Sequence, residues 1–174
     1  MITTVIFDLD GTLVESREAN FLAYKEAFTK FNIHLDKETF VSNFGKRWDE
    51  WISEIARENA ADIHKKKIQL FNFFLNRIKL IKKNFILLEA FSDTHKTLLL
   101  TNASEECTRF VINKFNLHFS KEFYVENYGS RRGALESILQ KYELHPREVL
   151  VIDDNKDNIS EAHNLGFRTH LATL

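Results

Sequence analysis

Two acidic residues that could do chemistry together lie in the stretch IFDLDGTLVES, which runs from Ile6 to Ser16. Asp8 and Asp10 are separated by one residue and follow a short apolar run typical of a buried strand. Such a pair can divide a transfer reaction: one carboxylate attacks phosphorus, and the other protonates the leaving group and then activates water. Gly11 lets the chain turn directly after them, so the two acids can be aimed differently. A turn or a helix N-cap is the alternative role for an isolated pair.

Further polar residues follow two later strand-like runs. In an open parallel sheet, ligands bind beyond the carboxyl ends of the strands, so residues at these positions are the first candidates for a site. Oxygen ligands that include several carboxylates suit Mg²⁺. The 7 His are scattered and the single Cys has no partner, which argues against zinc. The candidates are Thr101 and Asn102 after one run, and Asp153, Asp154, Asn155, Asp157 and Asn158 after another.

The elements that must position these side chains are short apolar runs, each of a length typical of a buried strand. Helical patterns with steps of three and four separate the later runs. Alternation of strand and helix predicts a parallel sheet with right-handed crossovers, and we expect a Rossmann-like three-layer α/β/α core. Gly166 is placed to end the last of these helices. The runs are Thr4–Phe7, Thr97–Leu100, Glu122–Val125, Glu148–Ile152 and Arg168–Leu171.

The first gap between runs is far longer than one crossover helix needs. Apolar residues recur through it at steps of three and four, beginning with Phe21, Tyr24 and Phe28, which indicates helices. Asp36 is predicted to cap one of them. We therefore expect an all-helical subdomain over residues 15–84, inserted into a core made of residues 1–14 and 85–174.

Composition bounds the remaining possibilities. The chain has 174 residues, is 44% hydrophobic and carries 24 Lys and Arg against 25 Asp and Glu, for a net charge of −1. This balance gives no global attraction to nucleic acid or to a membrane, and no apolar run approaches the roughly 20 residues that cross a bilayer. One cysteine cannot form an internal disulfide. We expect a cytoplasmic protein, present as a monomer or a weak homo-oligomer.

Three stretches, FDLDGTLVES, LLLTNAS and VIDDNKDNISEAHNLGF, resemble the first, second and fourth motifs of the haloacid dehalogenase superfamily, in the same order along the chain. The resemblance implies that Asp8 is the nucleophile that forms an aspartyl-phosphate. It implies that Asp10 is the general acid and base, with its backbone carbonyl helping to hold Mg²⁺. Thr101 would donate a hydrogen bond to the phosphoryl group, with the Asn102 amide close by.

The fourth motif of the family supplies metal ligands. Aligning IDDNKDNI with it makes Asp154 the direct ligand of Mg²⁺, together with Asp8 and Asp10, and leaves Asp153 bound directly or through water. Asn158 falls where many members of the family have a second Asp. Asp157 is one residue out of register, so it is a weaker candidate, better explained as a first-turn carboxylate that the helix dipole stabilises.

The third motif is where this sequence departs from the family. Members usually place a Lys about two dozen residues before the fourth motif, and the matching stretch here is GSRRGALESIL. Arg131 has the better spacing to Asp154, and Arg132 is the alternative. Arginine binds phosphate bidentately, but its planar fork is longer and less compact than the lysine ammonium.

The helical insert matches in position the small cap that closes over the site in this family. Lys46 and Arg47, which follow Gly45, are the cap residues we expect to contact substrate, with a solvated loop as the alternative. The resemblance predicts a Mg²⁺-dependent phosphatase of a small phosphorylated metabolite. A phosphomutase and a non-catalytic relative that binds Mg²⁺ or phosphate are the alternatives, whereas Asp10 argues against a dehalogenase.

Overall fold

The chain folds into two compact units, each described here by itself. The computed structural model describes residues 1–173. The first unit contains Met1–Glu15, Leu80–Asn102 and the chain from Leu117 onward, and the second contains Ser16–Lys79 and Ala103–Asn116. The second unit therefore contains residues 16–79 of the expected insert, whereas Glu15 and residues 80–84 lie in the first unit. It also contains residues 103–116, which the sequence pattern does not connect to the insert.

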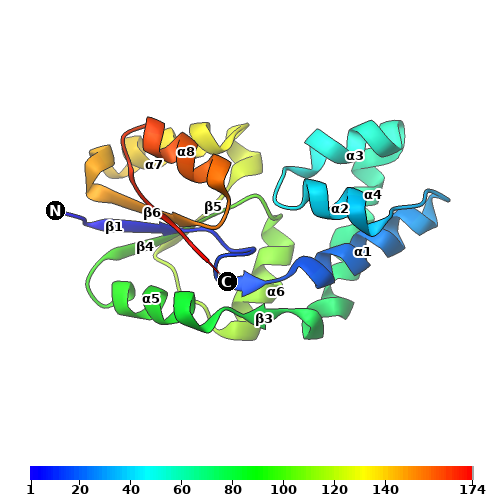
Figure 1. Cartoon of the computed structure of the whole chain (residues 1–174), viewed down its shortest axis with the longest axis horizontal. Coiled ribbons are helices and arrows are strands. Elements are labelled where there is room, and N and C mark those ends of the chain that lie inside the picture. Colours follow the sequence, from blue (N-terminus) through cyan, green and yellow to red (C-terminus); the bar gives the residue numbers. More distant parts are fainter. Residues whose placement is uncertain (174) are drawn as a thin grey trace. The chain divides into compact units, whose positions relative to one another are not determined.

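A five-stranded, fully parallel sheet forms the centre of the first unit, in the order β5-β4-β1-β6-β7 (Figure 1). The central strand β1 pairs with β4 on one side and β6 on the other, with Phe7 opposite Leu99 and Ile152. Each of the five predicted runs overlaps one of these strands, so the predicted fold class is confirmed. The strands are β1 (Thr4–Phe7), β4 (Lys96–Thr101), β5 (Lys121–Tyr124), β6 (Val149–Asp153) and β7 (Arg168–Leu171).

Helices cover both faces of this sheet. Helices α7 and α8 lie on one face and α5 on the other (Figure 1). Leu135 and Ile138 of α7 are fully buried and pack with Leu98 and Leu100 of β4, because the apolar face of the helix recurs every three or four residues. The helices are α5 (Lys82–Ser92), α7 (Arg131–Tyr142) and α8 (Lys156–Asn164), with short 3₁₀ turns η3 (Val125–Tyr128) and η4 (Pro146–Glu148).

The second unit is helical. Asp36 caps α2, as predicted, by accepting a hydrogen bond from the Thr39 backbone N–H at 2.7 Å. Across residues 1–173, no helix is long and apolar enough to cross a membrane. The elements of the second unit are α1 (Arg17–Lys30), α2 (Lys37–Asn43), α3 (Trp48–Ala56), α4 (Ala60–Phe71) and α6 (Glu105–Phe115), with 3₁₀ turns η1 (Arg57–Asn59) and η2 (Asn72–Arg77). Outside these elements, β2 (Val14–Glu15) of the first unit pairs with β3 (Lys79–Leu80) in a two-stranded sheet.

Aromatic residues make up much of the core of the second unit. Phe28 of α1 stacks on Trp51 of α3 at 6.1 Å between ring centroids, and Tyr24 meets the same indole edge-on at 5.2 Å. Phe40 of α2 also packs against Trp51. The helical spacing of these rings places them on one face of each helix, so the abundance of Phe in the chain serves packing here.

His64 of α4 is a buried histidine in this aromatic core. Its ring stacks on Trp48 at 4.5 Å, and its Nδ1 lies 3.0 Å from the Tyr24 hydroxyl. Burial, reinforced by the nearby Lys67 ammonium, lowers the pKa of His64 from its ordinary 6.5 to about 3, although Asp49 opposes the change. The imidazole is therefore neutral in the folded protein at neutral pH.

This buried histidine should make the second unit sensitive to acid. Between pH 6.5 and about 3, a proton binds His64 in the unfolded state but not in the folded state. The free energy of unfolding therefore decreases as the pH is lowered through this range, and levels off near pH 3. From pH 7 to pH 5 the expected loss is about 2 kcal/mol. Urea unfolding followed by Trp fluorescence measures it, because both tryptophans lie in this unit.

The matched variants separate His64 from the other titrating groups. His64→Gln should lose about 2 kcal/mol less than wild type over the same pH interval. His34→Gln changes an exposed histidine of the same unit and should follow wild type. Equal losses in wild type and His64→Gln would show that His64 is protonated in the folded state.

Candidate active site

The loop after β1 carries the predicted nucleophile. The backbone N–H of Asp8 donates to the Ile152 carbonyl at 2.9 Å, which ties the start of the loop to β6. The chain then turns back, since the backbone N–H groups of Leu13 and Val14 both donate to the Leu9 carbonyl, at 2.9 and 3.0 Å. Gly11 has φ +95°, a left-handed conformation that favours glycine. The turn leaves Asp8 buried, with 8% of its surface exposed.

Asp154 is held against this loop by Thr12. The Thr12 hydroxyl donates to Asp154 Oδ1 at 3.2 Å and accepts from the Asp154 backbone N–H at 3.0 Å. Asn84 of α5 donates from Nδ2 to the Thr12 carbonyl at 2.7 Å and is itself buried. These bonds join the loop after β1, the loop after β6 and α5, and so fix where the Asp154 carboxylate lies.

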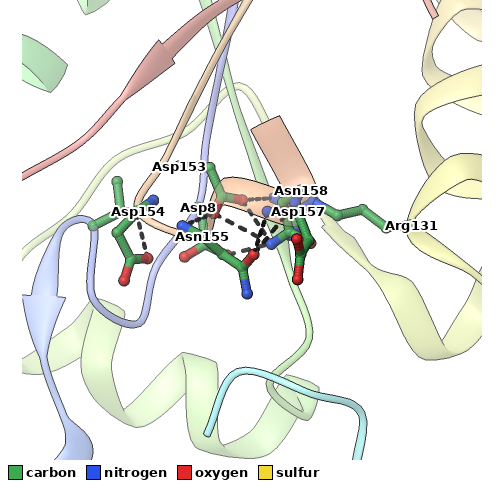
Figure 2. Close-up of polar contacts among 8 residues, drawn as sticks. Asp8, Arg131, Asp153, Asp154, Asn155, Asp157 and Asn158 are labelled. Atoms are coloured by element: carbon green, nitrogen blue, oxygen red, sulfur yellow. Dashed lines mark hydrogen bonds and ion pairs between the residues drawn. The ribbon is translucent and has the colours of Figure 1, made fainter. Parts of the chain in front are cut away.

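Asp153, at the end of β6, is fully buried and accepts from three neighbours (Figure 2). Arg131 Nη2 donates to Oδ2, and the Asn155 backbone N–H donates to Oδ1 at 2.8 Å. Asn158 Nδ2 contacts both oxygens, at 3.2 and 3.1 Å. Because each donor is fixed by the start of α7 or α8, the carboxylate is held rigidly.

Arg131 opens α7 and is buried, with 6% of its surface exposed. Besides its ion pair with Asp153, its Nη1 lies 3.7 Å from Asp8 Oδ1. Within residues 1–173, neither Nη1 nor Nε has a hydrogen-bond partner. Buried donors of a guanidinium are normally satisfied, so these N–H groups beside Asp8 are available to an anionic ligand.

Burial and like charge act together on Asp8. Burial raises the pKa of Asp8 well above its ordinary value, and the Asp153 and Asp154 carboxylates raise it further, while the Arg131 guanidinium opposes them. One positive charge thus faces several carboxylates. A bound cation would relieve this imbalance.

The carboxylates also suit a hard divalent ion. Oxygen atoms of Asp8, Asp153 and Asp154 all lie within 4.8 Å of one another. Several oxygen ligands and no sulfur or imidazole fit Mg²⁺ or a similar ion. The donor set therefore fits the metal that the sequence predicts, and it does so within the first unit alone.

The other predicted residues of the first unit lie at the same edge of the sheet. Thr101 ends β4, next to β1 in the sheet, and is buried. Asn102 follows it directly. Asp10 lies in the turn after β1 and is close enough to Asp8 to raise its pKa. Parallel neighbours place their carboxyl ends together, which is why residues distant in sequence meet here.

Other candidates lie elsewhere. Arg132 is exposed on α7, where its Nε donates to Glu136 at 2.8 Å, so Arg131 is the arginine beside Asp8. Lys46 and Arg47 lie in the second unit. Lys46 Nζ donates to Asn43 Oδ1 at 2.9 Å, and Arg47 forms a bidentate pair with Asp49 that holds the pKa of Asp49 below its usual value. Substrate contact by these two residues stays a prediction.

Sequence reasoning assigned no role to two residues that support the site. Thr12 appears in the first motif only as one of several polar residues, and nothing in the sequence indicates that its hydroxyl bonds Asp154. Asn84 gives no signal at all, because a single polar residue in a basic, helical stretch is ordinarily solvated. Only the fold brings it to the Thr12 carbonyl.

Gly11 should be required for activity more than for stability. A Cβ at this position would lie 2.3 Å from Asp154 Oδ2, so an alanine must push the carboxylate aside. Gly129 has a similar φ of +72° but no atom within 4 Å of the place a Cβ would take, which makes Gly129→Ala the matched control. We expect both variants to lose about 1–2 kcal/mol of stability. Only Gly11→Ala should also lose about 10-fold in activity.

Thermal melting and phosphate release measure the two effects. Equal activity in Gly11→Ala and Gly129→Ala would show that the position of the Asp154 carboxylate does not matter for turnover.

The fold and the edge-of-sheet acids together define a class: α/β proteins that use a carboxylate cluster at the carboxyl ends of a parallel sheet. Comparison of the sequence with known protein families makes this specific. The family described as haloacid dehalogenase-like hydrolase matches residues 5–172, and the chain belongs to that family. Among curated proteins, none matches the sequence significantly.

Solved structures of the same fold include three informative neighbours. A variant of CbbY from Rhodobacter sphaeroides, in complex with xylulose-(1,5)bisphosphate, has a TM-score of 0.87 at 18% identity, covering 100% of this chain and 87% of that one. A candidate phosphoglycolate phosphatase from Lactobacillus plantarum has 0.84 at 16% identity, covering 99% and 87%. β-Phosphoglucomutase from Clostridium difficile has 0.75 at 18% identity, covering 97% and 83%. At these identities the likeness establishes the fold.

Proposed function

We propose that this protein is a Mg²⁺-dependent phosphatase that hydrolyses a small phosphorylated metabolite through an aspartyl-phosphate on Asp8. One observation carries the proposal: the buried Asp8 carboxylate lies 3.7 Å from Arg131 Nη1, a buried N–H group with no hydrogen-bond partner in residues 1–173. A nucleophile beside an unused phosphate-binding donor is the arrangement that phosphoryl transfer needs. Membership of the hydrolase family supports it.

The side chains divide the reaction between them. A carboxylate oxygen of Asp8 attacks phosphorus, and the bond from phosphorus to the leaving oxygen breaks. Asp10 donates a proton to that oxygen and then removes one from the water that attacks the aspartyl-phosphate. Thr101 and Asn102 bind the phosphoryl oxygens. Arg131 stabilises the charge on the transferring group with its free N–H groups.

The cation would be held by Asp8, Asp154 and the backbone carbonyl of Asp10. When bound, Mg²⁺ supplies charge that offsets the repulsion between the phosphate and the carboxylates. The raised pKa of Asp8 supports this role, because a buried carboxylate among other carboxylates needs a counter-charge to stay ionised.

The substrate class rests on the neighbours and on the second unit. Two solved structures of CbbY, which has a similar fold, contain phosphate and xylulose-(1,5)bisphosphate respectively. We infer that the helical second unit acts as a cap that selects the substrate, with Lys46 and Arg47 as its first candidates for contact with an anionic group. The loop that carries them, directly after Gly45, is basic, which suits such a substrate.

A phosphomutase is the second candidate. β-Phosphoglucomutase from Clostridium difficile shares the fold, and a mutase would use the same acids. The two functions differ in whether water or a second hydroxyl receives the phosphoryl group. Release of inorganic phosphate from a monophosphate identifies the hydrolase, whereas isomerisation that needs a bisphosphate activator identifies the mutase.

The test is phosphate release from para-nitrophenyl phosphate by wild type, with Mg²⁺ and with a chelator, followed by a screen of sugar phosphates, nucleotides and phosphoglycolate. We expect turnover with Mg²⁺, loss of turnover with the chelator and recovery when Mg²⁺ is restored. Folded protein that releases no phosphate from any of these compounds would contradict the proposal.

A further inference from the structure

Both oxygens of the buried Asp153 carboxylate are already engaged by donors of the protein, one of them the charged Arg131 guanidinium. Two carboxylate oxygens offer about four lone-pair sites. Asp153 accepts from three donors: the Asn155 backbone N–H on Oδ1, Arg131 Nη2 on Oδ2, and Asn158 Nδ2, which is shared between both oxygens. Closeness to Asp8 and Asp154 makes Asp153 a ligand candidate, but each of its oxygens already accepts a hydrogen bond of its own and shares the Asn158 amide.

We propose that Asp153 and Asn158 are positioning residues: Asn158 fixes the Asp153 carboxylate, and Asp153 in turn holds Arg131 beside Asp8. Direct coordination of Mg²⁺ is then left to the other ligands, Asp8, Asp10 and Asp154. The inference rests on the proposed function, since it assigns how the arginine of that site is aimed.

The geometry of Arg131 shows what this arrangement achieves. Nη2 is used by Asp153, which leaves Nη1 and Nε as the buried N–H groups without partners among the described residues. Nη1 lies 3.7 Å from Asp8 Oδ1. A planar guanidinium held at one nitrogen has its other nitrogens fixed in direction, so fixing Asp153 aims the free donors at the group that Asp8 attacks.

The amide of Asn158 is the right group for this task. It donates to both oxygens of Asp153 and adds no charge. An aspartate at the same position would have no N–H to donate and would repel Asp153. The arginine and the asparagine thus act as a pair on the two sides of one buried carboxylate, which links the two departures from the usual family motifs.

The test combines metal binding with a double-mutant cycle on kcat. Mg²⁺ affinity is measured by isothermal titration calorimetry in wild type, Asn158→Ala and Asp154→Asn. We expect Asn158→Ala to stay within about 3-fold of wild type and Asp154→Asn to lose about 10-fold or more, because of the two substituted residues only Asp154 is a direct ligand in this proposal. An effect of Asn158→Ala as large as that of Asp154→Asn would show that Asn158, or the Asp153 carboxylate that it holds, belongs to the metal site and would overturn the proposal.

Turnover tests the link to Arg131. Asn158→Ala should lower kcat about 10-fold in the wild-type background but less than about 3-fold in an Arg131→Lys background, because that background no longer has the guanidinium that Asn158 helps to aim. Ser160→Ala, which truncates an exposed side chain on the same helix, should leave kcat unchanged. If the effects of Asn158→Ala and Arg131→Lys on kcat are additive, or if Asn158→Ala leaves kcat unchanged, the positioning role is wrong.

The calorimetry and the turnover measurements also distinguish failure of this inference from failure of the proposed function. Calorimetry needs no turnover, so a wild type that binds Mg²⁺ but releases no phosphate would refute the phosphatase while the affinity of Asn158→Ala still decides the role of Asp153. A wild type that binds no Mg²⁺ would refute both.

Discussion

Asp8→Asn is expected to lose about 10³-fold or more of the Mg²⁺-dependent phosphate release. The amide keeps the shape of the carboxylate but cannot attack phosphorus, so no aspartyl-phosphate forms. The free energy of unfolding should increase or stay unchanged. Since burial and the neighbouring Asp153 disfavour the charged form of Asp8, a neutral side chain removes an unfavourable charge. Without Mg²⁺, the melting temperature of the variant should equal or exceed that of wild type.

The control for this substitution is Asp93→Asn, which makes the same chemical change at an exposed acid of the first unit. It should retain wild-type turnover. Steady-state kinetics and thermal melting on the three proteins give the comparison. Turnover of Asp8→Asn within 10-fold of wild type would rule out Asp8 as the nucleophile, whereas a large fall in its melting temperature would make any loss of activity uninformative about chemistry and point to a structural role.

The sequence is informative about the sheet because buried parallel strands leave a simple signal. The runs at Thr4–Phe7 and Arg168–Leu171 have the same bounds in the structure, and the other three strands differ from their predicted runs by one residue at each end. Once the strands are placed, the position of Asp8 and Asp154 at one edge follows from topology alone. The strands predicted from apolar runs and the rules of parallel-sheet topology therefore place these acids at the same edge.

The limits of sequence reasoning appear where a side chain's direction decides its role. Arg131 and Arg132 are adjacent, so they point about 100° apart on the helix, and only packing of α7 against the sheet determines that Arg131 is buried. Asp153 and Asp154 are likewise adjacent, yet Asp153 accepts from Arg131 and Asn158 whereas Asp154 is bonded to Thr12. A motif gives the residue types but not these partners.

Long-range packing is equally invisible in the pattern. Helix α6 follows β4 in sequence, where an α/β repeat would place a crossover helix, but residues 103–116 cluster with the helical second unit. Lys114 of α6 donates to the Leu75 carbonyl of η2, a contact between segments far apart in the chain. Amphipathic spacing shows that a helix has an apolar face but not which partner covers it.

Arg131→Ala should cost about 3–5 kcal/mol of unfolding free energy, the largest stability effect expected of any substitution in the site. The substitution leaves Asp153 fully buried without its cation, and within residues 1–173 no other ion pair reaches this carboxylate. Removing one partner of a buried pair is costly because the other charge stays desolvated. Arg131→Lys keeps the charge but loses the fork, so about 1–2 kcal/mol is expected.

Arg132→Ala is the matched control, because it removes the same side chain one residue along α7. Its ion pair with Glu136 is exposed on both sides, at 61% and 53%, so its loss should stay within about 0.5 kcal/mol. Urea unfolding followed by circular dichroism compares the four proteins. If Arg131→Ala lies as close to wild type as Arg132→Ala does, the ion pair between Arg131 and Asp153 does not stabilise the fold, and the counter-ion role of Arg131 is wrong.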